Sequence, residues 1–192
     1  MNHLNYKIEF FSYWHTSSGL AAGTASNLTV LKDEDNCPII KGRTLKGMLR
    51  DAADNLIQLS NGEVVSEDFI NEVFGVGEEE ASSKSDYAAA SSCFFTDALL
   101  SEAVVQHAKK NRLQRHFYTT LHSTAIAENG IAKQHSLRSL EVCVPLTLYA
   151  QIREFPAAYE AEMECCFQWV KRMGLNRHRG LGRCQFSTFQ KA

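Results

Sequence analysis

The sequence has no long hydrophobic run and no apolar leader. No stretch of 18 consecutive apolar residues occurs in its 192 residues, which excludes an ordinary membrane-spanning helix. The first residues, MNHLNYKIEFF, carry charges at Lys7 and Glu9, where a signal peptide would need an apolar stretch. We therefore expect a cytoplasmic protein with no membrane partner.

The chain also lacks a strong net charge. Its formal charge is only -2 at pH 7, so it is not a protein that attracts nucleic acid through overall basicity. Cations are instead concentrated in two segments that contain no acid, KGRTLKGMLR at 41–50 and RHRGLGR at 177–183. Any affinity for a polyanion must come from these local clusters.

No pair of cysteines has the C-x-x-C spacing of a zinc site. The six cysteines are Cys37, Cys93, Cys143, Cys165, Cys166 and Cys184. We interpret them as reduced thiols of the core. The seven histidines are scattered, so a metal site assembled from distant residues stays the weaker alternative, and no metal is expected.

Length and composition fit one domain over residues 1–192, since 44% apolar residues can build one sizeable core. Alternation predicts a first strand at 4–13, with Tyr6, Ile8 and Phe10 on its buried face. The further elements expected are a helix from an N-cap at Thr44 to about Leu59, a short helix between Ser66 and Gly75, a strand beginning at 93, β-rich residues 136–152, a helix at 157–173 ended by Gly174, and a strand at 184–189.

This order predicts an α+β, ferredoxin-like or RRM-like β-α-β-β-α-β fold with insertions. One insertion is a small-residue loop after the first strand, which ends in LTVL at 28–31. Residues 75–92 are polar, small and aperiodic, and we interpret them as a mobile loop. Asn129-Gly130 predicts a tight hairpin turn in the second half. The fold hosts many functions, so it does not determine the activity.

Both basic segments contain what a phosphate group needs. Around Gly42, a helix N-terminus lies next to Lys41, Arg43, Lys46 and Arg50; an ordinary solvated helix face is the alternative. In RHRGLGR, Gly180 and Gly182 allow a close backbone approach while neighbouring arginines supply donors. This G-x-G lacks a third glycine and follows a helix, which excludes a dinucleotide fingerprint. An arginine-rich turn before an edge strand is the alternative here.

Four stretches in this order resemble the RAMP superfamily of CRISPR-associated proteins. They are a small-residue loop ending in VLKD, then CPIIKGRTLKGMLRDA, then FFTDALL with TAIAENGIAKQHSLRSLEVCVPLTLYAQI, and finally GLNRHRGLGRCQF. The chain is most similar to the RRM-like backbone subunits of type III effectors, which polymerise along a guide RNA and hold target RNA against it.

The resemblance implies an RNA-binding subunit of a CRISPR ribonucleoprotein in antiviral defence. Its partners would be guide RNA, target RNA and other RAMP subunits, including copies of itself. Residues 101–135 would form a hairpin that protrudes into the guide-target duplex. The implied RNA-binding residues are His15, Lys41, Gly42, Arg43, Lys46, Arg50, Arg138, Arg177, His178, Arg179, Gly180 and Gly182. Contacts to phosphate carry no sequence information, which suits a protein that must accept any guide.

One residue departs from the family pattern. Where active relatives have an aspartate that cleaves target RNA with a metal, this chain has Asn27, and an amide is neither a base nor an anionic Mg²⁺ ligand. We therefore expect a scaffold without a cofactor, and Mg²⁺ only if the chain cleaves target RNA. The alternatives are a guide-processing endoribonuclease with His15 as general base, and a ferredoxin-like domain that binds a small molecule.

Overall fold

The computed structural model describes residues 2–21, 27–76, 91–128, 130–134 and 136–190. Most of the loop expected at 75–92 lies outside the described residues, as does Asn129 of the expected turn. No helix of the described part is long and apolar enough to cross a membrane.

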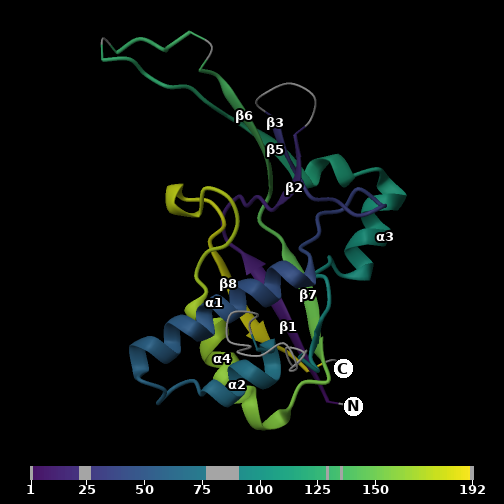
Figure 1. Ribbon diagram of the computed structural model, residues 1–192. Coiled ribbons are helices and arrows are strands. Elements are labelled where there is room, and N and C mark those ends of the chain that lie inside the picture. The colour runs from purple at the N-terminus through teal and green to yellow at the C-terminus, as the bar shows by residue number, and fades with distance from the viewer. Residues whose placement is uncertain (1, 22–26, 77–90, 129, 135, 191–192) are drawn as a thin grey trace, which may run out of the picture.

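Four strands form the lower sheet of the molecule (Figure 1). They are β1 (His3–Phe10), β4 (Phe94–Phe95), β7 (Thr147–Arg153) and β8 (Cys184–Thr188), in the order β4-β7-β1-β8. Each neighbouring pair is antiparallel. The crossovers β1-α1-β4 and β7-α4-β8 therefore each place one strand of the other between their own two, which is the ferredoxin-like arrangement predicted from the sequence.

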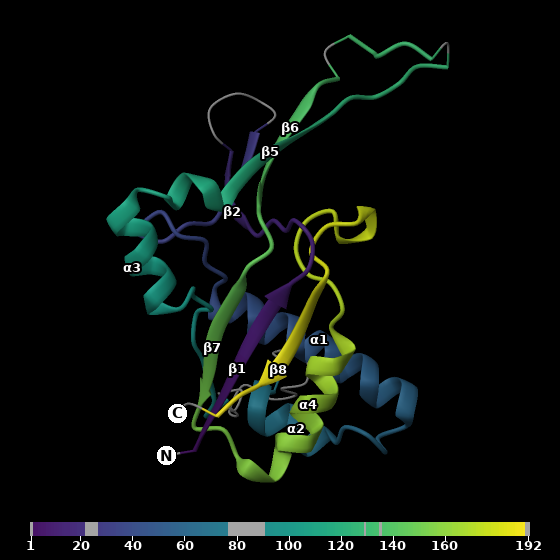
Figure 2. The ribbon, with the colours of Figure 1, turned by 180° about the vertical axis from the view of Figure 1, so that it is seen from behind.

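The helices of the core lie on one face of this sheet, and Figure 2 shows β7, β1 and β8 in front of them. They are α1 (Gly42–Ser60), α2 (Glu67–Phe74) and α4 (Glu160–Trp169). The alternation in β1 turns Tyr6, Ile8 and Phe10 into the core as predicted. The ring of Tyr6 lies 5.0 Å from that of Phe167 on α4, which joins helix to sheet.

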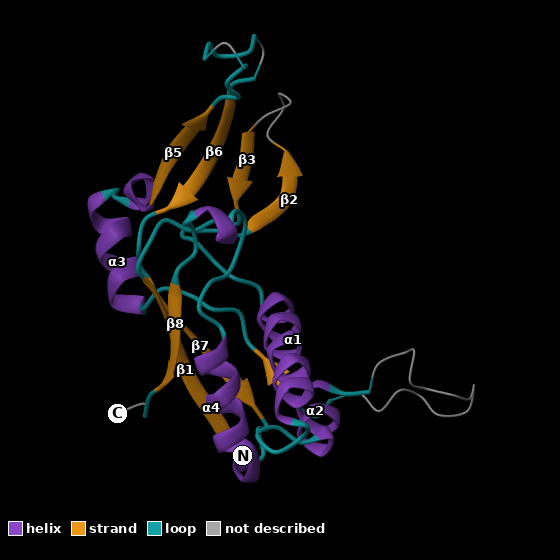
Figure 3. Ribbon diagram, turned by 90° about the vertical axis from the view of Figure 1, so that its left-hand side faces the viewer, coloured by secondary structure: helices purple, strands orange, loops and turns teal. Residues whose placement is uncertain are grey.

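A second sheet stands above the first (Figure 3). Its strands are β2 (Ser17–Ala21), β3 (Asn27–Val30), β5 (Tyr118–Ser123) and β6 (Arg138–Cys143), in the order β2-β3-β6-β5. Trp14 anchors the base of this sheet, since it is fully buried, forms a bridge with Cys143 and donates its Nε1–H to Val144 O at 3.0 Å. The two sheets are thus fixed to each other by a buried aromatic residue.

The protruding hairpin is present, and it begins later than the resemblance implied. It consists of β5 and β6, with Ser123 opposite Arg138, and continues to a bridge between Ile126 and Ala132. The earlier part of 101–135 is instead a helix, α3 (Glu102–Asn111), followed by the 3-10 turn Gln114–Phe117. Ala108 is buried under α3, so this helix belongs to the body of the protein.

Two predicted helix ends were wrong. Thr44 is not the N-cap of α1, because the helix begins at Gly42 with Lys41 as its cap. The last helix ends at Trp169 and not at 173, because the following residues pair with the start of β8: Met173 N–H donates to Gly182 O at 2.9 Å. The cap at Ser66 was predicted correctly, since its Oγ accepts from Phe69 N.

The six cysteines are free, and all but Cys165 are buried. Burial raises the pKa of the Cys166 thiol and of the Cys184 thiol to about 12. Such thiols stay protonated and act as small apolar groups of the core.

Candidate nucleic-acid interface

The N-terminus of α1 is held against β4 through Gly42. A Cβ at this position would lie 2.0 Å from Phe95 O, so only glycine permits the approach. Gly42 N–H donates to Asp97 Oδ1 at 2.8 Å, and Lys41 Nζ donates to Asp97 Oδ2 at 2.9 Å. Burial raises the pKa of Asp97, but these two donors outweigh it and hold the pKa below its usual value. A side chain of the protein therefore already binds this helix start as an anion.

The four cations of 41–50 do not form one surface. Arg50 Nη1 donates to Gly75 O at 3.0 Å, and Arg50 Nε lies 3.9 Å from Asp54 Oδ2. Lys46 is half-buried, and burial, to which the charge of Arg50 adds, lowers the pKa of its ammonium group. Arg43 is exposed in the first turn of α1. Arg43 and Lys41 therefore remain near the helix start, whereas Lys46 and Arg50 serve the side of α1 that contacts α2.

The C-terminal glycine-rich loop is fixed to the segment that follows β1. A Cβ on Gly174, which has φ +89°, would lie 2.3 Å from His15 O, and one on Gly182, with φ +69°, would lie 1.8 Å from Met173 O. Gly182 N–H donates to Tyr13 O at 2.7 Å. Gly174 is thus required for close approach and a left-handed backbone, although the sequence suggested a helix stop.

The tip of this loop presents three consecutive basic residues to solvent. Arg177, His178 and Arg179 form a short 3-10 turn, and all three are exposed. Arg172 Nη1 donates to Arg177 O at 3.1 Å and supports the turn from below. Gly180 has φ +93° with open space around it, so its role is the backbone conformation alone.

A cavity of about 490 Å³ joins the two segments that the sequence singled out. Its wall includes Lys41 and Thr44 from the start of α1, Arg177 from the glycine-rich loop and His15 from the segment between the sheets. Asp51, one helical turn and more beyond Lys41, supplies an acid to the same wall. The fold therefore brings Lys41 and Arg177, 136 positions apart, to one concave surface.

His15 lies in this wall but is 0% exposed. Its Nδ1 is 2.7 Å from Glu141 O, and because a carbonyl only accepts, we assign the proton to Nδ1. Nε2 is buried and has no partner among the described residues. The carboxylate of Glu141 in turn accepts from Val30 N at 2.9 Å and Lys32 Nζ at 2.8 Å. His15 thus connects the two sheets, and its ring is closed to substrate in this conformation.

Arg138 and Asn27 lie on the upper sheet, away from this cavity. Arg138 is the exposed first residue of β6, and the backbone of Asn27, in β3, pairs with Ser139 beside it. No group of three or more His, Cys, Asp or Glu side chains that could hold a metal ion occurs within the part of the chain that the structure describes. Asn27 as the replacement of a catalytic acid stays a prediction.

The sequence model of the RAMP superfamily matches residues 7–185. The chain belongs to the RAMP superfamily. The match spans the first strand, both basic segments and the hairpin of this RAMP chain, as the resemblance implied. No curated protein sequence matches it.

Solved structures share the RAMP fold with this chain at low sequence identity. A chain of type III-B Cmr-beta in its apo state, seen by cryo-EM, aligns with TM-score 0.68 and 13% identity over 98% of both chains. A chain of Cmr-beta bound to cognate target RNA aligns with TM-score 0.68 and 11% identity, over 98% of this chain and 97% of that one. A chain of a type IV-B CRISPR complex aligns with TM-score 0.63 and 13% identity, over 100% of this chain and 92% of that one.

Two acids that organise the interface of this RAMP chain were not identified from its sequence. Asp97 binds the start of α1, and Glu141 connects His15 with Lys32. Each is a single acid within an otherwise apolar or β-rich stretch, CFFTDALL and SLEVCVPL. A charge in such a stretch needs a partner, and that was the available signal.

Proposed function

We propose that this chain is an RNA-binding subunit of a CRISPR ribonucleoprotein effector. The surface made by the start of α1 and the glycine-rich loop holds the guide RNA by its phosphates. The hairpin of β5 and β6 positions the complementary target RNA. Other RAMP subunits, including further copies of this chain, complete the effector.

The observation that carries this proposal is the convergence of Lys41 and Arg177 on one cavity. Arg43, Arg177 and Arg179 around it are exposed and form no salt bridge within the described residues. Exposed, unpaired guanidinium groups are suited to phosphate oxygens. Membership of a superfamily found in CRISPR effectors, together with the RNA-bound Cmr-beta chain of the same fold, supports RNA as the polyanion.

The test is a comparison of two variants in the binding of labelled single-stranded RNAs of unrelated sequence. Arg177→Gln with Arg179→Gln should weaken binding to every sequence alike, because phosphate contacts do not read bases. The slope of log K against log salt should fall by about 1.4, at about 0.7 for each lost phosphate contact on single-stranded RNA.

Arg50→Gln is the matched control, since Arg50 is a cation of the same chain that is bound to Gly75 O. Its affinity and salt slope should equal those of the unmodified protein once circular dichroism has shown that it is folded. Equal losses in both variants, or a loss for some RNA sequences only, would contradict phosphate binding at the loop.

The His15-based processing activity receives no support from the geometry. A general base must reach the 2′-hydroxyl within hydrogen-bond distance, and the His15 ring is fully buried with Nδ1 bound to Glu141 O. We propose a structural role for His15 between the sheets. Cleavage of a precursor RNA that is abolished by His15→Gln, in a variant that remains folded, would restore the processing alternative.

A further inference from the structure

Strand β8 forms one edge of the lower sheet. Its only partner strand is β1 within the part of the chain that the structure describes. An edge strand presents a row of backbone N–H and C=O groups that another chain can pair with. The residues 184–189, CQFSTF, contain no charge and no proline, the two devices that commonly prevent such pairing.

The start of this edge is already paired, and the rest is open. Cys184 N–H donates outward to Lys171 O at 3.0 Å, and Arg172 forms an antiparallel bridge with Arg183. Because backbone groups alternate sides along a strand, Phe186 and Thr188 turn their N–H and C=O groups outward as well. The chain before Lys171 does not pair with them, because it has turned away into α4.

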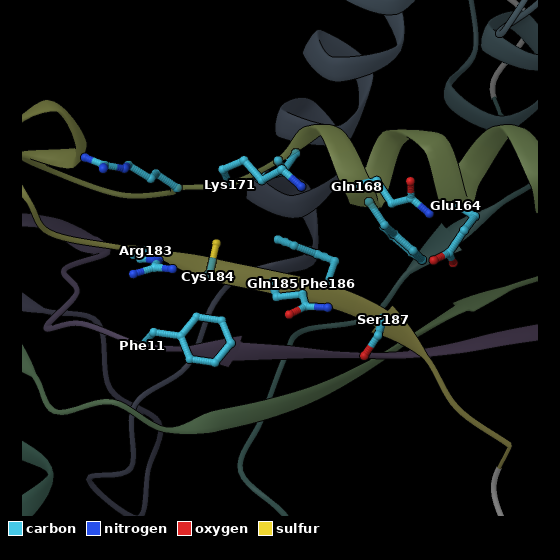
Figure 4. Close-up of a pocket in the computed structure, with 12 residues that line it drawn as sticks. Phe11, Glu164, Gln168, Lys171, Arg183, Cys184, Gln185, Phe186 and Ser187 are labelled. Carbon is cyan, nitrogen blue, oxygen red and sulfur yellow. The ribbon is translucent and has the colours of Figure 1, made fainter.

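A groove of about 720 Å³ lies where such a pairing strand would run (Figure 4). It is bounded by α4 on one side and by β8 on the other, with Lys171 and Arg183 at one end and Glu164 nearer the other. A second hollow, which shares Glu164, continues past Glu160 and Thr188. The groove is thus basic where β8 begins and acidic where β8 ends.

We propose that this groove binds an extended segment of another protein, which adds to β8 as a fifth, antiparallel strand. The segment continues the line of Lys171 and Arg172, which already run antiparallel to β8. Its N-terminal end then lies beside Glu164 and carries a basic residue. Its C-terminal end lies beside Lys171 and Arg183 and carries an acidic residue.

The open backbone groups select a polypeptide over RNA. Phe186 and Thr188 offer donors and acceptors in alternation, and an extended peptide backbone satisfies both. A phosphate backbone supplies acceptors for the N–H groups but no donor for the C=O groups. This inference is independent of the proposed guide-RNA surface, which lies on the other arm of the glycine-rich loop.

The probes are two end-blocked peptides of identical composition, Lys-Thr-Val-Thr-Val-Glu and Glu-Thr-Val-Thr-Val-Lys. Each is added to the ¹⁵N-labelled full chain, and each is also attached to its C-terminus through a glycine-serine linker, which raises the effective concentration to about the millimolar range. The peptide that begins with Lys should slow amide hydrogen exchange at Phe186 and Thr188 at least tenfold, and should bind at least fivefold more tightly than the other.

Thr188→Pro removes an outward N–H and should abolish this protection, whereas Thr188→Val keeps the N–H and should preserve it. Exchanging the charges with Glu164→Lys and Lys171→Glu should reverse the preference between the peptides. Failure of both attached peptides to protect Phe186 would overturn the proposal, and equal protection by both would overturn its charge order. Perturbation of these amides by a single-stranded RNA but by neither peptide would show a nucleic-acid surface instead.

Discussion

Asp97 holds Gly42 at the start of α1, with 2.8 Å between Asp97 Oδ1 and the Gly42 nitrogen. The same carboxylate binds Lys41 Nζ at 2.9 Å. The residue that sets the position of the helix is therefore also the one that controls how much positive charge Lys41 offers. An incoming phosphate competes with Asp97 for the same donors.

Removal of the Asp97 carboxylate should separate these two roles. Asp97→Ala leaves the buried Gly42 N–H without its acceptor and should lower the free energy of unfolding by about 1–3 kcal/mol. Asp97→Asn keeps an acceptor oxygen and, since Asp97 is 35% exposed, should cost less than about 1 kcal/mol. Urea unfolding measures both values, and equal costs would show that the hydrogen bond to Gly42 is unimportant.

The acid limb of stability should depend on Asp97. Its pKa is lower in the folded protein than in the unfolded chain, so its contribution is complete above the unfolded value of about 3.9 and is lost as the pH falls through the folded value. The difference in stability between the unmodified protein and Asp97→Asn should therefore shrink as the pH decreases below about 4. A constant difference across this range would show that ionisation of Asp97 contributes nothing.

Two glycines of the C-terminal loop should respond differently to alanine. At Gly182 a Cβ would lie 1.8 Å from Met173 O, whereas at Gly180 nothing lies within 4 Å. Gly180→Ala then introduces only left-handed strain and should cost roughly 1–2 kcal/mol. Gly182→Ala must also displace the loop and should cost roughly 3 kcal/mol or more. Thermal unfolding compares them, and the order of the two costs is the decisive result.

The outer hairpin should be dispensable for folding and needed for target RNA. Ser123 and Arg138 are paired directly, so the residues between them can be replaced by Asn-Gly, the two-residue turn that matches strand twist. The removed part holds exposed Ile126 and Ile131, and stability should change by less than about 1 kcal/mol. Circular dichroism and binding of labelled target RNA to a guide-bound complex test both halves. Unfolding would show that the tip supports the body.

Replacement of Asn27 by aspartate should create or restore cleavage of target RNA in Mg²⁺ or Mn²⁺. A carboxylate supplies the hard anionic ligand that an amide lacks. The assembled complex is incubated with a labelled complementary RNA, and Asn27→Asp is compared with the unmodified protein and with Asn27→Ala on a gel. Cuts by the unmodified protein would contradict the scaffold role, and cuts by none of the three would leave cleavage to another subunit.

Local patterns were sufficient for much of the fold. The alternation of Tyr6, Ile8 and Phe10 identified the central strand, and Ser66 identified a helix start, because both signals depend only on neighbours in the sequence. The end of α4 could not be found in this way. It depends on the pairing of Met173 with Gly182, a contact that exists only once β8 is in place.

The candidate site divides in the same manner. The sequence by itself determined the superfamily, the order of the core strands and helices, and the two basic segments, since composition, periodicity and motif order are properties of the chain alone. Only the tertiary structure decided which cations share a surface: it placed Lys41 and Arg177 at one cavity, turned Arg50 toward Gly75, and buried His15 against Glu141. Helix rotation and the packing of distant segments set these directions, and neither is encoded by the spacing of charges along the chain.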